Sequence, residues 1–534
     1  MATATHTMLK TRTTRAWGAK AVPFLLALFF MASALWDLGN TDVIDTDAAR
    51  HAMNGAFLYD LVRTGHLWHP VDYAEQYYGH LPALSMPYHP PLFPVMEALF
   101  FAVFGVKLLS ARIAVALAVG ACVLLLFRLT ERTLGSHVLA ACVTSTTLWL
   151  MTSQQVARDV MLEYPAMAFG LAALLCLGDM KEDFTLARAI GFAIFASAAF
   201  WTKQHTAFLG GVILLYPVLS GRWRTLLRIP AFVSILLFGA GVGGYIVLSR
   251  HFHNAGIRGA ATSASDLHYI ANATLPAYFS WITADLVGMA GVFGACALLL
   301  RAVPRSREAP AFKLSLYWAW IISTALVLAD LGATSNRYLF FLCPAAIAIG
   351  YAWIFQGCRR LWGERAATVT VCGFALVWFV NGCFYPREYL RGPGEAAKAV
   401  LKGQPTRILY AGEADGNFIF AVRVLDPSLQ VTVIPSAKLP ASTFQAKELE
   451  MFCRQYGVNW VVLENAPMRH PWSVLHNAPP PFLRLERTIP LESTRTRWQT
   501  GSVEVFRVEG AGAAPGGILK LPVWRLGGDI AVKL

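Results

Sequence analysis

Residues 42–55 read DVIDTDAARHAMNG and residues 88–92 read YHPPL, and both stretches belong to one loop between two hydrophobic segments. Three carboxylates, Asp42, Asp45 and Asp47, open this loop directly after the first hydrophobic segment. Such carboxylates are either the solvated start of a loop or groups with a chemical role at the lipid–water boundary. The functional interpretation needs only one of them to act as a general base or to bind a metal ion.

The composition is that of a membrane protein with a soluble extension. Of the 534 residues, 56% are hydrophobic and only 14% are charged, whereas a soluble domain has about 25% charged residues. Long apolar runs recur between residues 21 and 384, and the chain after residue 385 has the composition of a soluble domain. We therefore predict a cytoplasmic N-terminal tail at 1–20, a transmembrane domain at 21–384 with its first loop at 40–91, and an extracytoplasmic domain at 385–534.

Twelve apolar segments approach the length of about 20 residues that a bilayer core requires. They are 21–39, 92–106, 111–127, 136–152, 164–180, 189–202, 205–219, 229–249, 285–301, 314–330, 338–356 and 367–384. The first follows several basic residues and has no convincing cleavage site, so we predict an uncleaved span with a cytoplasmic N-terminus.

The distribution of Lys and Arg indicates that 92–106 does not cross the membrane. If it stays at one interface, the later cytoplasmic loops carry most of the basic residues, as positively charged loops remain inside. The segment is also short and contains Glu97, which is costly in lipid. We therefore expect about eleven spans, in a cytoplasmic (inner) membrane, with the first loop and the C-terminal domain on the outer side.

This topology brings five further polar residues to the side that carries the acidic loop: His89, Arg158, Glu163, Lys203 and Arg337. Each has an ordinary structural interpretation as well. A basic residue at the end of a span often reaches to the interface, and an acid at a helix start suits the helix dipole. Lys203 and Arg337 on one face could instead hold a phosphate.

The residues from Asp47 onward have a helical pattern, so we expect Asp47 to cap an amphipathic helix that lies on the membrane. Capping and catalysis are competing explanations for Asp47. Pro90 and Pro91 fix an extended turn before the next helix, whatever His89 does.

The C-terminal part alternates between strand and helix patterns, which predicts a small α/β domain. Strands are expected near 407–412, 430–434, 458–463 and 502–508, with helices at 418–425 and 442–456. It has no G-x-G-x-x-G motif, so no nucleotide site is predicted. The net charge of +13 is explained by the topology of the spans, and nothing in the sequence indicates nucleic-acid binding. The nine cysteines show no zinc or disulfide spacing.

The order of these motifs along the chain resembles that in the GT-C superfamily of glycosyltransferases. The closest resemblance is to bacterial relatives of the protein O-mannosyltransferases and of the aminoarabinose transferases that modify lipid A. The matching elements are Asp47-Ala48, His89-Pro90-Pro91-Leu92, Phe104-Gly105, Ala111-Arg112, Ala157-Arg158, Glu163-Tyr164-Pro165, Thr202-Lys203-Gln204 and Arg337-Tyr338-Leu339. The resemblance covers about residues 20–384 and agrees with a juxtamembrane helix at 92–106.

The sequence departs from the family pattern at three positions. Ala48 stands where the family has a second acid, so the matching acid is either Asp45 or Asp47. Glu163 replaces an Asp, and Gln204 replaces a Gly. These changes leave open whether a divalent metal ion takes part, for which Asp47 and Glu163 are the candidate ligands.

The resemblance implies an α-helical polytopic membrane enzyme of the cell envelope, a hexosyl- or pentosyl-transferase. Its donor would be a polyprenyl-phosphate sugar, and its acceptor a hydroxyl of a lipid, glycan or protein outside the membrane. It implies Asp47, or Asp45, as the base, and Lys203 and Arg337 as the groups that neutralise the leaving phosphate. Two alternatives have other functions: a flippase of a lipid-linked sugar, for which we find no internal repeat or mid-membrane charges, and a non-catalytic assembly protein.

Overall fold

The structure is a computed structural model that describes most of the chain. The described residues are 20–178, 184–252, 314–330, 335–401, 406–465, 470–494, 501–510, 517–523 and 528–533. The predicted segment 285–301 lies outside them.

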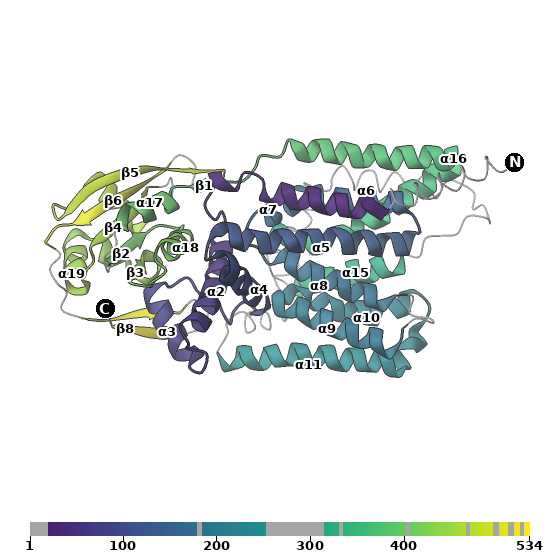
Figure 1. Cartoon of the computed structure of the whole chain (residues 1–534), viewed down its shortest axis with the longest axis horizontal. Helices are drawn as coiled ribbons and strands as arrows, with labels where there is room; N and C mark the ends of the chain where they lie inside the picture. The colour runs from purple at the N-terminus through teal and green to yellow at the C-terminus, as the bar shows by residue number, and fades with distance from the viewer. Residues whose placement is uncertain are drawn as a thin grey trace.

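Figure 1 shows a bundle of helices with a domain of mixed strands and helices at one end. The helices of the bundle and its connections are Lys20–Asn40, α2 (Thr46–Arg63), α3 (Pro70–His80), α4 (Leu92–Phe104), α5 (Leu108–Leu134), α6 (His137–Trp149), α7 (Met151–Ala157), α8 (Glu163–Leu177), α9 (Leu186–Thr202), α10 (Phe208–Leu219), α11 (Ile229–His251), α15 (Ser315–Asp330) and α16 (Cys343–Cys383). Two short 3₁₀ segments, η2 (Gln204–Ala207) and η5 (Asn336–Phe341), join α9 to α10 and precede α16.

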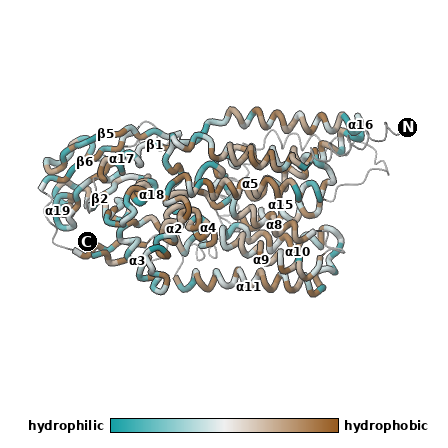
Figure 2. Tube along the Cα trace, in the orientation of Figure 1, coloured by the Kyte–Doolittle hydropathy of each residue, from teal (hydrophilic) through white to brown (hydrophobic). Residues whose placement is uncertain are grey.

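Four of the described helices are long and apolar enough to cross a membrane: Lys20–Asn40, α5, α11 and α16. Helix α16 contains two predicted segments, which meet at Gly363, where φ is 85° and a side chain would be strained. All the other described segments coincide with shorter helices. The helical, membrane-type fold is therefore confirmed, whereas the number of eleven spans remains a prediction. Figure 2 shows hydrophobic residues running along the whole bundle.

Helix α4 corresponds to the segment that was predicted not to cross. It has 13 residues, or about 20 Å of helix, and lies at the end of the bundle nearest the C-terminal domain (Figure 1). Glu97 on this helix is fully buried, and it packs so closely against Gly55 of α2 that a Cβ there would lie 2.7 Å from the Glu97 Cβ. This position agrees with a juxtamembrane helix.

The C-terminal part is built on a six-stranded mixed sheet in the order β1-β5-β6-β4-β2-β3. Its strands and helices are β1 (Leu390–Arg391), α17 (Pro393–Val400), β2 (Thr406–Ala411), α18 (Asp415–Leu425), β3 (Val431–Pro435), α19 (Ala446–Tyr456), β4 (Trp460–Asn465), α20 (Val474–Asn477), β5 (Leu483–Ser493) and β6 (Gly501–Val508). Strand β2 pairs in parallel with both β3 and β4, and β6 pairs antiparallel with β4 and β5. The predicted strands and helices are confirmed to within a few residues. The sequence did not predict β5 or the separate hairpin of β7 (Ile518–Pro522) and β8 (Asp529–Lys533).

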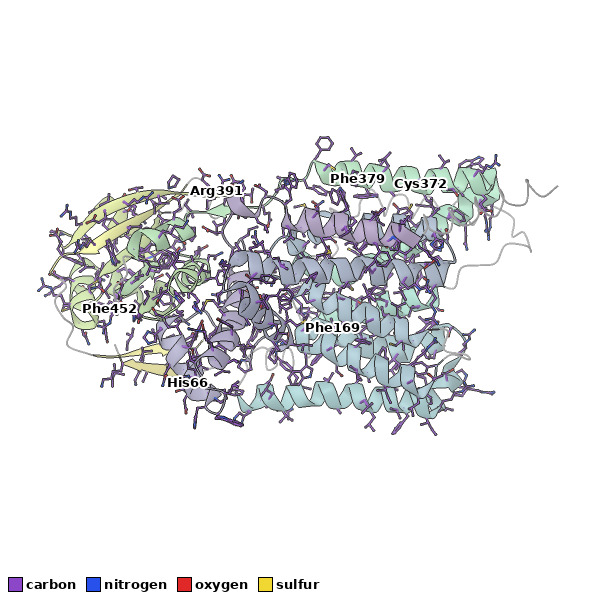
Figure 3. The ribbon with its side chains drawn as sticks, in the orientation of Figure 1. His66, Phe169, Cys372, Phe379, Arg391 and Phe452 are labelled. Carbon is purple, nitrogen blue, oxygen red and sulfur yellow. The ribbon has the colours of Figure 1, made fainter. Side chains whose placement is uncertain are left out.

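The two parts are joined through the first loop. The Asp42 N–H donates to the Leu390 carbonyl at 2.8 Å, and the Asn417 amide donates to the Val43 carbonyl at 2.5 Å. Arg423 of α18 forms two hydrogen bonds to the Asp60 carboxylate of α2, at 2.6 and 2.7 Å, with both side chains almost fully buried. Figure 3 labels Arg391 at this boundary and His66 in the turn after α2. The loop that carries the carboxylates is therefore held from both sides.

Candidate active site

Helix α2 begins immediately after Asp45, which is its N-cap. The Asp45 carboxylate accepts a hydrogen bond from the Asp47 N–H at 2.8 Å. The Asp159 carboxylate in turn accepts from the backbone N–H groups of Ile44 and Asp45, at 3.2 and 2.7 Å. The prediction that Asp47 caps this helix was therefore wrong, because the residue two positions earlier reaches the free N–H groups. Asp47 lies in the first turn with its carboxylate available for another partner.

That α2 lies on the membrane surface remains a prediction, but its apolar side chains pack mainly against protein. Most of its residues are buried, because α4 packs against one face and α18 of the C-terminal part against another. Gly416 at the start of α18 comes so close that a Cβ there would lie 3.4 Å from the Thr46 carbonyl oxygen. The apolar pattern of α2 therefore faces protein on two sides, and Asp47 is held rigidly.

Four charged side chains from distant parts of the sequence meet beside this helix end. An Arg337 amino group lies 2.6 Å from the Asp47 carboxylate, and the Lys203 amino group lies 2.7 Å from the Glu163 carboxylate. The Arg337 Nε lies 3.7 Å from that same Glu163 oxygen, which links the two pairs. Glu163 starts α8, Lys203 ends α9, and Arg337 lies in η5. These distances bring the four predicted residues together in space, and their role as one functional site remains a prediction.

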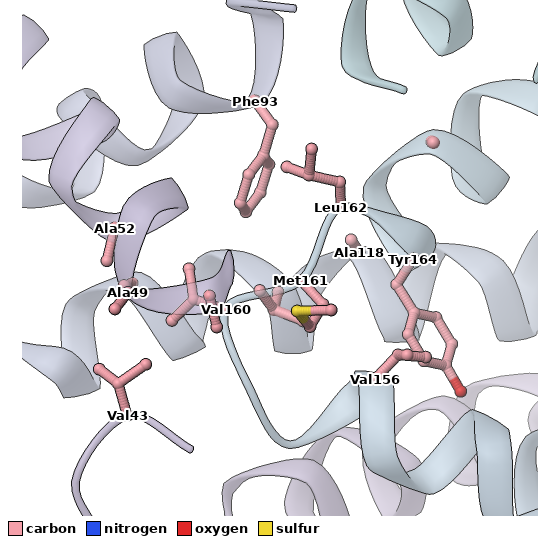
Figure 4. Packing of buried hydrophobic residues seen from close by; sticks show 14 of the residues in the cluster. Val43, Ala49, Ala52, Phe93, Ala118, Val156, Val160, Met161, Leu162 and Tyr164 are labelled. Atoms are coloured by element: carbon pink, nitrogen blue, oxygen red, sulfur yellow. The ribbon is translucent and has the colours of Figure 1, made fainter. Parts of the chain in front are cut away.

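The exposure of these side chains differs across the cluster. Glu163 is 0% and Lys203 5% exposed, whereas Arg337 is 19% and Asp47 26% exposed. The side with Asp47 and Arg337 is therefore the side that a substrate can reach. Figure 4 shows buried hydrophobic packing in which Phe93 of α4 and Leu162, the residue before Glu163, extend toward each other.

Two histidines complete the side of the cluster near Asp47. His51, one helical turn after Asp47, lies edge-to-face with His89, with ring centroids 4.6 Å apart. Burial lowers the pKa of His51 to about 3 and lowers the pKa of His89 well below its usual value. Burial alone would raise the pKa of Asp47, but the adjacent Arg337 guanidinium outweighs this effect and lowers it below its ordinary value. The carboxylate is therefore charged and the imidazoles are neutral near pH 7.

The Tyr338 ring forms a platform on the other side. The Lys203 amino group and the Arg337 guanidinium lie 5.1 and 5.2 Å from its centroid, within the range of cation–π contacts. The His205 ring stacks on Tyr338 with centroids 4.1 Å apart and planes inclined by 20°. Sequence reasoning assigned no role to His51, His205 or Tyr338. Available signals were the i, i+4 spacing from Asp47 to His51 and the adjacency of the other two to Lys203 and Arg337.

Arg158 does not join this cluster. Its guanidinium donates to the Trp36 carbonyl at 3.2 Å, at the end of the first helix. The neighbouring Asp159 is buried, lies 3.7 Å from Arg112, and organises the backbone before α2. Arg158 and Glu163 were predicted to lie in one site, but Arg158 lies at a helix junction and only Glu163 belongs to the charged cluster.

The residues of the site do not fit a metal ion well. Asp47 and Glu163, the candidate ligands, each face a basic side chain at 2.6–2.7 Å. Within the described part of the chain, no group of three or more His, Cys, Asp or Glu residues is arranged to share an ion. We therefore derive no step through a metal.

Comparison with known proteins finds a family match over part of the chain and a similar fold. A family described as dolichyl-phosphate-mannose-protein mannosyltransferase matches residues 88–249. Crystal structures of ArnT from Cupriavidus metallidurans, bound to undecaprenyl phosphate and in the apo state, have TM-scores of 0.55 and 0.54 with this chain at 14% and 15% identity. They align over 93% and 92% of this chain and 99% and 98% of theirs. The predicted resemblance to the GT-C superfamily is confirmed.

A second type of solved structure has a similar fold. The archaeal oligosaccharyltransferase AglB from Archaeoglobus fulgidus, in complex with an inhibitory peptide and a dolichol-phosphate, has a TM-score of 0.53 at 12% identity, over 84% of this chain and 70% of its own. No curated protein sequence matches the chain. The family match and the GT-C fold together support a membrane glycosyltransferase. The matched region includes His89, Glu163 and Lys203 but neither Asp47 nor Arg337, which the fold brings to the same place.

Proposed function

We propose that this protein transfers a sugar from a polyprenyl-phosphate carrier to a hydroxyl acceptor on the outer face of the cytoplasmic membrane. The observation that carries the proposal is the meeting of Asp47, Glu163, Lys203 and Arg337. Two basic side chains beside a carboxylate are the groups needed to hold a phosphate and to take a proton from an alcohol. The ArnT structure bound to undecaprenyl phosphate and the AglB structure with a dolichol-phosphate support a carrier of this class.

Arg337 has a central role in the proposed reaction because it pairs with the base in the resting site. While its guanidinium lies 2.6 Å from Asp47, the carboxylate is a weak base. A donor phosphate offers Arg337 a second anionic partner, with which the guanidinium can form a bidentate pair. When Arg337 turns to the phosphate, Asp47 loses its counter-charge and becomes more basic, so donor binding activates the base.

In the transfer step, the acceptor oxygen attacks the anomeric carbon of the sugar and gives its proton to Asp47. The bond between that carbon and the phosphate oxygen breaks, and the electron pair leaves with the polyprenyl phosphate. Lys203 and Arg337 stabilise the added charge on the phosphate as it develops. Attack from the face opposite the phosphate inverts the anomeric carbon. Glu163 holds Lys203 in position, and His89 lies near enough to contact the donor.

The apolar bundle would hold the carrier tail, and the C-terminal part would contact the acceptor, whether this is a lipid, a glycan or a protein. The topology inferred from Lys and Arg supports an outer-face site. Asp45 is assigned a capping role, since its carboxylate bonds to the Asp47 N–H at 2.8 Å.

The experiment is a transfer assay on the purified protein in detergent micelles. Micelles have no bilayer that separates two compartments, so flippase activity cannot contribute to the result. Polyprenyl-phosphate sugar is supplied with lipid, glycan or peptide acceptors in separate reactions, and mass spectrometry follows the carrier. The proposal predicts release of polyprenyl phosphate and a glycosylated acceptor. Donor that stays intact in micelles, while it is moved across the bilayer of a proteoliposome, would establish the flippase instead.

A further inference from the structure

His205 is a polar residue of the site that the proposed reaction does not yet use. It lies in η2, two residues after Lys203. Both of its ring nitrogens are buried, and neither has a hydrogen-bond partner among the described residues. A neutral imidazole always carries one N–H donor and one acceptor nitrogen, and burying both unpaired is unfavourable. A partner from outside the protein would remove this penalty.

The surroundings of His205 indicate what that partner is. Its ring is stacked at 4.1 Å on Tyr338, the same ring that Lys203 and Arg337 approach to 5.1 and 5.2 Å. His89, Lys203 and Arg337 are all close enough to act electrostatically on its ring. Lys203 and Arg337 each pair with a carboxylate in this structure, so a partner that shares these two basic groups and a histidine N–H is an anion that accepts several hydrogen bonds. An ionised phosphate has this chemistry.

We propose that His205 donates a ring N–H to the carrier phosphate of the donor, and so acts as a third phosphate-binding group beside Lys203 and Arg337. This inference rests on the proposed function, because it identifies a further contact of the same substrate. The stack with Tyr338 fixes the plane of the ring, so a ligand contacts the nitrogens at the edge of the ring. Rotation of the ring by 180° exchanges each nitrogen with a carbon and keeps the stack, so either nitrogen can be presented.

The test compares the full-length wild-type protein with His205→Phe and His205→Gln in nanodiscs. Phe keeps the aromatic stack and removes the N–H, whereas Gln keeps an N–H donor and removes the ring. The probe is farnesyl phosphate, a short polyprenyl phosphate without a sugar, and its Kd is measured by titration. His66→Phe, in the exposed turn after α2, is the matched control for replacing a histidine.

We expect His205→Phe to raise the Kd for farnesyl phosphate and the donor KM about tenfold or more, since the lost bond is to a charged group. The Kd of His205→Gln should stay within about threefold of the wild-type value, because the amide keeps a hydrogen-bond donor and the change in binding free energy is smaller than that of one lost hydrogen bond. His66→Phe should bind farnesyl phosphate with the wild-type Kd. The melting temperature of the ligand-free His205→Phe variant should not fall, since this substitution keeps the stack and removes two unpaired buried nitrogens, and this result separates binding from a structural role.

Wild-type affinity in His205→Phe would overturn the inference. So would a lowered melting temperature with an unchanged Kd, which would make His205 a packing residue. If the wild type binds farnesyl phosphate, and His205→Phe weakens this binding, but no sugar is transferred from any donor, the phosphate site stands and the transferase function is contradicted.

Discussion

At the scale of single residues, the pairing of Asp47 with Arg337 determines how the site responds to pH. The guanidinium outweighs burial and lowers the pKa of Asp47 below its ordinary value. The Asp47 carboxylate is therefore ionised at every pH above about 5. This behaviour differs from that of a solitary buried carboxylate, whose pKa would be raised.

The pH dependence of kcat/KM reports the pKa values of the free enzyme. We predict that protonation of Asp47 causes no decrease in the wild-type kcat/KM above about pH 5. Replacing Arg337 with Gln removes the charge that lowers the pKa, and burial then raises it. The residual kcat/KM of Arg337→Gln should therefore fall as the pH drops from about 7 to 5. Arg337→Lys retains the charge and is the control. Parallel profiles for wild type and Arg337→Gln would show that Arg337 does not set this pKa.

Some residues of the site could be predicted from the sequence, and others could not. Residues in ordered motifs, such as Lys203 and Arg337, could be identified because their positions at span ends followed from hydropathy and charge. The N-cap could not be assigned, because Asp45 and Asp47 both fit a helix start and only the backbone geometry separates them. Arg158 and Glu163 are close in sequence, but the chain between them turns at a helix junction and separates them in space.

At the scale of elements, α2 is the helix whose position the site depends on. Two arginines contact Asp60 on this helix. Arg423, only 2% exposed, makes two hydrogen bonds across the boundary with the C-terminal part, whereas Arg63, 39% exposed, lies 3.1 Å away on the same helix. Tyr77 also donates to this carboxylate at 3.2 Å. The buried pair therefore fixes α2, and the exposed pair contributes little.

We predict that Arg423→Met destabilises the protein by about 3–5 kcal/mol, because it removes the buried charge partner of Asp60 and leaves only the half-exposed Arg63 beside this carboxylate. Arg63→Ala, the matched control at the exposed pair, should cost less than about 1 kcal/mol. The melting temperatures of the purified variants measure the difference. Adding Asp60→Asn to Arg423→Met should recover part of the loss. If Arg423→Met and Arg63→Ala lowered the melting temperature equally, the buried pair would not stabilise the protein more than the exposed pair does.

The same helix shows the limit of pattern reading. The helical pattern from Asp47 onward predicts an amphipathic helix that lies on the membrane, but hydropathy does not distinguish lipid from a protein surface. The C-terminal part supplies that surface through α18, and its docking depends on contacts between residues more than 300 positions apart, such as Asp60 with Arg423. The strands β2, β3 and β4 could be predicted from their apolar patterns, whereas the mostly exposed residues of β5 gave no such pattern.

At the scale of the whole molecule, the first helix and the C-terminal part define two ends of the bundle. Thr41, just after the first helix, contacts Leu390 at the start of the C-terminal part, and the first helix runs from there toward the opposite end of the bundle (Figure 1). A cavity of about 520 Å³ with Arg128, Arg132 and Arg188 in its lining lies among the residues predicted to be cytoplasmic. This gathering of arginines agrees with the charge rule for membrane topology.

We predict that reporters fused at the N-terminus and after the last residue lie on opposite sides of the cytoplasmic membrane, with the C-terminal reporter outside. An enzyme reporter active only outside the cytoplasm, paired with one active only inside, measures this in intact cells. Both reporters on one side would mean an even number of crossings and would contradict an outer-face site.

The central claim, that Asp47 is the base, is tested most directly by single-turnover release of polyprenyl phosphate from the donor in the presence of an acceptor. Asp45→Asn is the matched control, because asparagine also caps helices. The account predicts that Asp47→Asn slows release by about 100-fold or more, while Asp45→Asn stays near the wild-type rate and melting temperature. Release by Asp47→Asn at the wild-type rate, with correct folding, would contradict it.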